Sequence, residues 1–166
     1  MKYLMLNSYL KERFGCKVYK IAIDGGFTCP NRDGTIGYGG CTFCSEGGSG
    51  EFAAPPAEIQ EQIRQARERV DSKFPRSMPE EDYRYIASFQ SFTNTYGNTQ
   101  RLHELYRETL KDPRILILSV GTRPDCLEEE KVQMLSELRQ ESGKPVWVEL
   151  GLQTIHERTT RRIHRG

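Results

Sequence analysis

Short apolar runs alternate along the 166-residue chain with stretches in which apolar residues recur at helical spacing. The short runs predict four β-strands, at residues 17–24, 85–90, 115–120 and 146–153. The helical spacing predicts helices at residues 9–14, 59–70 and 102–110, from 127 to about 143, and a basic helix from about residue 156 to the end. Because strands and helices take turns, the order predicts an α/β fold with a parallel sheet and helical crossovers.

Several boundaries can be placed by residue type. Gly15 and Gly143 are suited to ending helices, and the Pro55-Pro56 pair can begin one. The run 115–120 is apolar apart from Ser119, as expected of a strand covered on both faces. The helix that stops near Gly143 carries Leu127, Val132, Leu135 and Leu138.

Four strands are too few to close a barrel, for which eight strands is the small complete case. We therefore expect about four parallel strands with outer helices and an open edge, as in a partial (β/α) barrel. Such an edge suggests a fragment, or a chain that needs a partner at that strand.

The unusual polar clusters all lie at or just beyond the carboxyl ends of the predicted strands. They are the cysteine-containing loop 29–44, the loop 90–96, the stretch 122–125, and Glu149 with Gln153. Sites in parallel α/β folds gather at the carboxyl ends of strands, so we expect these clusters to share one rim.

Composition narrows the class of protein. The chain is 36% hydrophobic and 28% charged with a net charge of +1, which fits a soluble domain without a global nucleic-acid footprint. It contains no apolar run of about 18 residues and no secretory signal at its N-terminus, so we expect a cytoplasmic protein away from membranes. The arginines near the end are locally basic, either a contact surface or a solvated helix face: Arg158, Arg161, Arg162 and Arg165.

Cys29, Cys41 and Cys44 form a set of three thiols in a glycine-rich loop. Cytosolic thiols stay reduced, so such a cluster indicates metal binding or catalysis rather than disulfides. A structural zinc site needs four ligands, and the three histidines are distant in sequence. A redox CxxC pair needs no third cysteine. An iron–sulfur cubane held by three thiolates keeps one iron open, and Phe43 could shield it from water.

The two other cysteines, Cys16 and Cys126, are not paired with another ligand at metal-binding spacing. We expect both to be ordinary buried small side chains.

The loop, with spacing C-x11-C-x2-C, resembles the cluster-binding loop of radical S-adenosylmethionine (SAM) enzymes. The wider pattern resembles the YhcC/YtqA-like branch, related to oxygen-independent coproporphyrinogen III oxidases and elongator-type catalytic subunits. The resemblance covers essentially the whole chain, through residues 24–34, 89–96, 121–127 and 148–154. It implies that residues 1–166 are the N-terminal portion of a radical SAM core domain of TIM-barrel type.

The resemblance also implies roles for particular residues. Cys29, Cys41 and Cys44 would bind three irons of a [4Fe–4S] cluster, with SAM on the fourth. Gln90 and Thr93 lie in the loop that contacts the methionyl amino group in relatives, Gln153 matches a ribose contact, and Arg165 matches the partner of the SAM carboxylate. The guanidinium and amide chemistries suit these roles.

Arg123 and Glu149 are further candidates for cofactor binding, because both are expected on the same rim. For Glu149 the alternative is a carboxylate paired with Arg123. For Arg165 the alternative is an exposed helix charge.

The activity implied by the resemblance is reductive cleavage of SAM to a 5′-deoxyadenosyl radical, with modification of a tRNA wobble uridine as the indicated use. It also implies an electron donor such as flavodoxin or ferredoxin. The alternative is a non-catalytic iron–sulfur or zinc module acting in an assembly.

Overall fold

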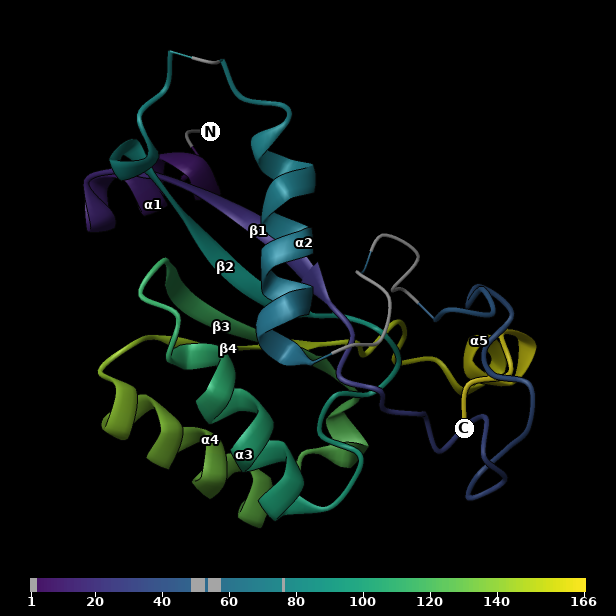
Figure 1. The fold of residues 1–166 in the computed structure, drawn as a ribbon. Coiled ribbons are helices and arrows are strands. Elements are labelled where there is room, and N and C mark those ends of the chain that lie inside the picture. The colour runs from purple at the N-terminus through teal and green to yellow at the C-terminus, as the bar shows by residue number, and fades with distance from the viewer. Residues whose placement is uncertain (1–2, 49–52, 54–57, 76) are drawn as a thin grey trace.

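A computed structural model describes residues 3–48, 53, 58–75 and 77–166 of the chain (Figure 1). Its elements in order are α1 (Leu6–Phe14), β1 (Lys17–Ile23), α2 (Ile59–Asp71), η1 (Glu80–Asp82), β2 (Tyr83–Phe89), α3 (Thr99–Leu110), β3 (Ile115–Thr122), η2 (Pro124–Cys126), α4 (Glu129–Ser142), β4 (Val146–Leu150) and α5 (Glu157–Arg162). The strands form one sheet in the order β1-β2-β3-β4, and every neighbouring pair is parallel. The predicted α/β fold with four parallel strands is thereby confirmed, and the sheet is open.

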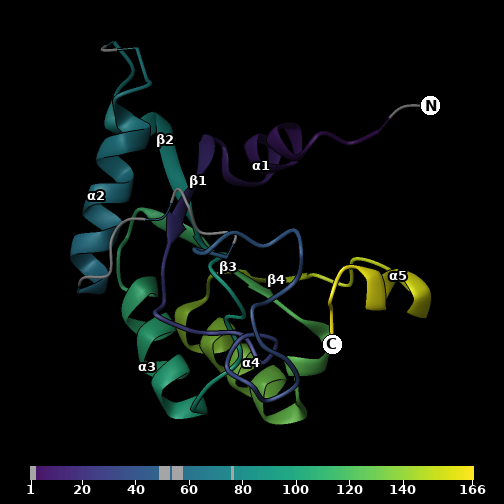
Figure 2. The same cartoon turned by 90° about the vertical axis from the view of Figure 1, so that its right-hand side faces the viewer.

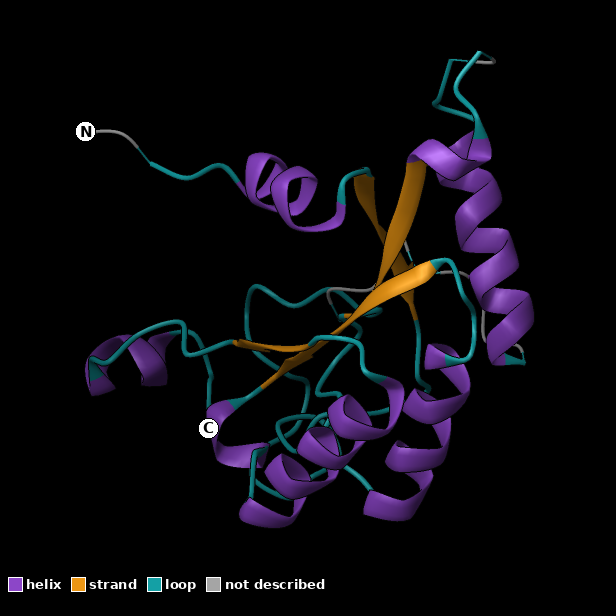
Figure 3. Cartoon of the chain, turned by 90° about the vertical axis from the view of Figure 1, so that its left-hand side faces the viewer, coloured by secondary structure: helices purple, strands orange, loops and turns teal. Residues whose placement is uncertain are grey.

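The sheet has helices on both faces. The larger core joins one face of the strands to α2, α3 and α4, and residues such as Ile63, Tyr106 and Leu138 are almost wholly buried in it. On the opposite face, Leu10 of α1 packs against Val18 and Ile117. Figure 3 shows α1 lying on the other side of the sheet from α2. Alternate strand residues therefore enter different cores, as the two-residue period of a strand requires.

Local residue types account for several element ends. Gly15 and Gly143, which follow α1 and α4, have φ angles of 72° and 67°, in the left-handed region that glycine adopts without a steric penalty. Asn98 begins α3, and its side chain accepts a hydrogen bond from the Arg101 amide at 3.0 Å. Pro55 and Pro56, expected to begin the second helix, lie outside the described residues.

Two predicted elements near the end of the chain were too long. The fourth strand stops at Leu150. It cannot extend to Gln153 as predicted, because Gln153 has a φ of 69°, which an extended strand cannot contain. The basic helix covers only Glu157–Arg162. His164 has a φ of 51°, so the residues after α5 leave the helical path.

One apolar residue of α4 lies outside the core. Val132 of α4 is 44% exposed, whereas Leu135 and Leu138 on the same helix are buried. Val132 lies just outside the stripe that faces the sheet, a difference that one residue of helical rotation produces. The longest helix in the described part of the chain has 14 residues, and none there is long and apolar enough to span a bilayer.

Candidate functional site

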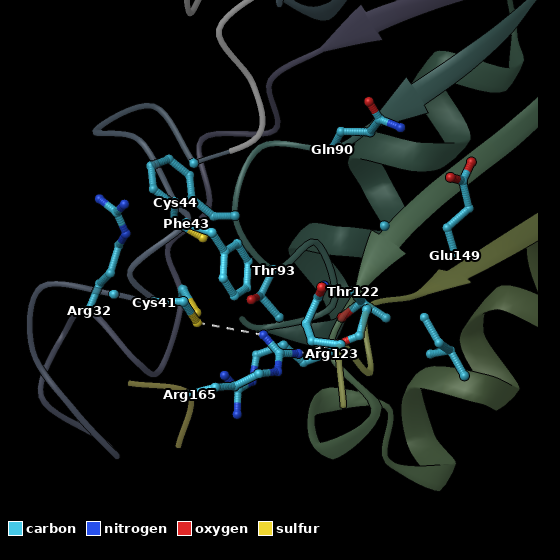
Figure 4. A pocket seen from close by; sticks show the side chains of 18 residues that line it. Arg32, Cys41, Phe43, Cys44, Gln90, Thr93, Thr122, Arg123, Glu149 and Arg165 are labelled. Atoms are coloured by element: carbon cyan, nitrogen blue, oxygen red, sulfur yellow. Dashed lines mark hydrogen bonds between the residues drawn. The ribbon is translucent and has the colours of Figure 1, made fainter. Parts of the chain in front are cut away.

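A cavity of about 340 Å³ opens at the carboxyl ends of the strands (Figure 4). All nine residues singled out from the sequence line it: Cys29, Cys41, Cys44, Gln90, Thr93, Arg123, Glu149, Gln153 and Arg165. They come from the cysteine loop after β1, the ends of β2, β3 and β4, and the segment after α5. The parallel topology brings them together because every strand ends at the same edge.

The cysteine loop folds back on itself through its own backbone. The Arg32 amide donates to the Cys29 carbonyl at 2.8 Å, and the Cys44 amide donates to the Cys41 carbonyl at 3.0 Å. Gly40 has a φ of 82°, and a Cβ there would lie 2.7 Å from Arg32 Nε. Only glycine fits that position, so the glycine content of the loop has a steric reason.

The three thiols differ in their surroundings. Cys41 is buried, and Cys29 and Cys44 are half-buried; all five cysteines of the chain are free. Burial raises the pKa of the Cys44 thiol above its ordinary value, and negative charge on Cys41 raises it further. The Cys41 sulfur lies 3.4 Å from Asn31 Nδ2 and 3.8 Å from Arg165 Nη1, both hydrogen-bond donors.

The donor chemistry of this loop fits a thiolate-bound cluster. Three soft sulfur ligands surround one cavity, and three arginines contribute positive charge beside them. In the described part of the chain, no three His, Cys, Asp or Glu side chains already stand at metal-holding positions. The thiols would thus have to turn toward a bound group.

Arg123 is almost wholly buried, at 4% exposure. Its Nε and Nη2 donate to the two carboxylate oxygens of Asp125 at 2.9 and 2.6 Å. Its Nη1 is buried and has no hydrogen-bond partner among the described residues. A buried guanidinium nitrogen without a partner is costly, so a ligand with an acceptor group would relieve it.

Glu149 does not pair with Arg123, so that alternative was wrong. Its Oε1 lies 2.5 Å from Lys20 Nζ, and Ser119 also donates to it. Lys20 is on β1 and Glu149 on β4, so the two outer strands meet through their side chains across the sheet face. Burial alone would raise the pKa of Glu149, but the bonds from Lys20 and Ser119 bring it below its ordinary value.

The loop after β2 is held tightly against its neighbours. Thr93 is 1% exposed, and its amide donates to the Thr28 carbonyl at 3.2 Å, which ties this loop to the cysteine loop. Asn94 is fully buried, and its side chain donates to the carbonyls of Phe89 at 3.1 Å and Gly121 at 2.8 Å. Gln90 and Thr93 are therefore presented by a rigid segment.

Two cavity-lining residues have a left-handed backbone although they are not glycine. Phe92 has a φ of 61° and Gln153 a φ of 69°. Each such residue costs about 1 kcal/mol or more, and such strain often concentrates at functional sites. Arg165 supports the second turn, because its Nη2 donates to the carbonyl of Gly151.

Several cavity residues were missed by sequence reasoning. Arg32 donates to the carbonyls of Ser45 and Glu46, and its guanidinium carbon lies 5.1 Å from the centre of the Phe92 ring. It therefore clamps the two ends of the cysteine loop onto the loop after β2. The signal that could have pointed to Arg32 is an arginine within the cysteine-containing loop. No local feature of the sequence distinguishes Phe92.

Phe43, which was expected to shield the cysteines, does line the cavity and is 52% exposed. Figure 4 shows its ring between Cys44 and Thr93. Of the remaining cysteines, Cys126 is buried as expected, whereas Cys16 is only half-buried.

Fold and site together define an α/β protein whose parallel sheet presents three cysteines, three arginines and two glutamines to one cavity. No protein-family model matches the chain.

The chain is similar to curated proteins of bacteria and an archaeon. It is 46% identical over 166 residues to YtqA of Bacillus subtilis, covering 99% of this chain and 49% of that protein. It is 41% identical over 162 residues to YhcC of Escherichia coli, covering 98% and 49%. A protein of Methanocaldococcus jannaschii is 34% identical over 161 residues, with 95% and 46% covered. The chain thus spans about half the length of the relatives it matches, and their names state no activity.

Proposed function

We propose that this chain carries the cofactor-binding part of a radical SAM enzyme, with a partial (β/α) barrel of that type. The observation that supports it most is the common cavity. Three cysteines with the spacing C-x11-C-x2-C line it together with the six polar residues expected to bind the cofactor, four of which the resemblance assigns to SAM.

The cysteine loop has the ligand role in this proposal. Cys29, Cys41 and Cys44 would hold three irons of a [4Fe–4S] cluster and leave the fourth iron for SAM. When bound, cluster and SAM supply reductive cleavage of SAM to methionine and a 5′-deoxyadenosyl radical. The task of the chain is to bind, orient and shield these groups.

Arg123 and Arg165, two of the arginines at the cavity, supply positive charge for anionic groups. Arg123 lines the cavity, its buried Nη1 has no hydrogen-bond partner among the described residues, and a guanidinium is well suited to pairing with a carboxylate. Arg165 reaches toward the Cys41 sulfur, so its charge would also offset the repulsion between neighbouring thiolates. We assign the SAM carboxylate to this pair of arginines.

The amide and aromatic side chains orient the rest of the ligand. Gln90 and Gln153 each offer a donor and an acceptor to hydroxyl and amino groups. Glu149 is held by Lys20 and Ser119, so its charge stays fixed at the end of β4. Phe43, at the cavity beside Cys44, would limit the access of water.

The substrate and the electron donor belong to the same proposal. We assign modification of a tRNA wobble uridine and an electron donor of the flavodoxin or ferredoxin kind. The exposed arginines of α5 support a phosphate-bearing partner. They lie on a helix close to the cysteine loop, because the Thr42 amide of that loop donates to the Ile163 carbonyl, just after α5, at 3.0 Å.

Anaerobic reconstitution tests the proposal. We expect about four irons and about four sulfides per chain, an absorption spectrum that changes when SAM is added, and 5′-deoxyadenosine after reduction. Cys29→Ala, Cys41→Ala and Cys44→Ala should each lose the cluster. Cys16→Ala is the matched control, because Cys16 packs near α1 and not at the cavity.

Two outcomes of the reconstitution would count against the proposed function. One zinc without sulfide would favour a non-catalytic metal module, and a cluster that survives all three cysteine substitutions would refute the ligand assignment. Adding undermodified tRNA tests the substrate separately, since it should increase 5′-deoxyadenosine formation.

A further inference from the structure

The segment after α5 lies against the cysteine loop, although the two are more than a hundred residues apart. Figures 1 and 2 show the loop beside the end of the chain in both views. The Thr42 amide donates to the Ile163 carbonyl at 3.0 Å. Two residues after Ile163, Arg165 turns back toward Cys41.

Asn31 stands at the junction between this segment and the loop. Its side chain is buried, with the residue 4% exposed. Nδ2 donates to the His164 carbonyl at 2.5 Å and lies 3.4 Å from Cys41 Sγ, while Oδ1 accepts from the Gly166 amide at 3.4 Å. Asn31 is thus in contact with a predicted ligand and with both neighbours of Arg165 in sequence.

The packing around Asn31 leaves it little freedom. A Cβ on Gly37 would lie 2.6 Å from Asn31 Oδ1, so the glycine at that position makes room for the amide. Asn31 is not among the described residues that line the cavity. Its effect on a ligand there would have to pass through Cys41 and Arg165.

We infer that Asn31 is a positioning residue that couples the Cys41 ligand to Arg165; this rests on the proposed function and deepens it. Its hydrogen bond to sulfur withdraws electron density from the thiolate, which stabilises the reduced form of a bound cluster. Its bond to the His164 carbonyl fixes the backbone immediately before Arg165. One side chain thereby sets both the electron affinity of the cluster and the position of the carboxylate-binding arginine.

The test compares Asn31→Leu, which keeps the approximate size and removes both polar atoms, with Asn31→Asp, which keeps the shape and loses the donor. Asn7→Asp on the exposed face of α1 is the matched control. In reconstituted Asn31→Leu we expect a more negative reduction potential by redox titration. We also expect a SAM Kd at least about tenfold higher, equivalent to about 1.4 kcal/mol. The control should match the unchanged protein in both.

The two measurements separate positioning from simple damage. A potential that is unchanged in both Asn31 variants would overturn the inference even if SAM binding fell, because disturbed packing alone would weaken binding. Changes in both quantities support it.

A readout without cofactor keeps this inference separable from the proposed function. In the apoprotein, the Thr42 amide should exchange with solvent at least about tenfold faster in Asn31→Leu, because its bond to Ile163 opens more often. Unchanged exchange of the Thr42 amide would overturn the inference that Asn31 holds the segment after α5 against the cysteine loop. If the unchanged protein binds no iron, the proposed function is wrong, and the exchange result still decides whether Asn31 holds the two segments together.

Discussion

Asn94 should be the residue on which the loop after β2 depends. The perturbation is Asn94→Ala. It removes donors from the Phe89 carbonyl at 3.1 Å and the Gly121 carbonyl at 2.8 Å, at a position with 0% exposure. The Gly121 carbonyl keeps the Asn94 backbone amide at 3.1 Å, so the loss falls mainly on the side-chain bonds.

The expected magnitude follows from these contacts. Two buried hydrogen bonds contribute about 1 kcal/mol each, and a carbonyl deprived of its donor costs about 1 kcal/mol more. The free energy of unfolding should therefore fall by about 3 kcal/mol. For a chain of this size that corresponds to a Tm lower by about 6–12 °C.

Urea denaturation followed by circular dichroism measures this change directly. Asn7→Ala on the exposed part of α1 serves as the control and should stay within about 0.5 kcal/mol of the unchanged protein. A loss below about 1 kcal/mol for Asn94→Ala would refute the reasoning, because it would mean that the loop is held by its other contacts.

Two further predictions concern titratable groups. Because the pKa of Glu149 is lowered, its pairing with Lys20 stabilises the fold at neutral pH, and this contribution is lost as the pH falls through the lowered pKa. Glu149→Gln should thus cost up to about 1 kcal/mol at pH 7, since both side chains are partly exposed, and progressively less at acidic pH as Glu149 becomes protonated; a cost that stays equal from neutral to acidic pH would contradict it. Burial, reinforced by the charge of Asp125, raises the pKa of Cys126 to about 11. At pH 8 iodoacetamide should therefore label Cys16 well before Cys126 in the apoprotein, as mass spectrometry would show, and labelling of Cys126 first would contradict the burial argument.

The element order was readable from the sequence because hydrophobic periodicity is a local property. Residues 115–120 are apolar apart from Ser119 and do form a strand covered on both faces, within β3. The boundaries were less readable where tertiary contacts override local pattern. Gln153 is the last residue of the predicted strand 146–153, yet its backbone has a φ of 69°.

The candidate site was partly readable for a similar reason. The polar residues that follow the strands could be assigned to one rim, since parallel strands all end at the same edge, and they do line one cavity. The partner of Glu149 could not be read. Lys20 lies 129 positions away, and only the order of strands in the sheet brings the two together.

The sequence by itself determined the α/β class, the order of strands and helices along the chain and the three-cysteine loop, because each depends on residue type and spacing along a short stretch. The tertiary structure decided which distant groups meet. It placed Asn31 between Cys41 and the residues around Arg165, and it left one nitrogen of Arg123 buried without a partner among the described residues. Such contacts depend on how the packed sheet directs separate loops, which no local pattern encodes.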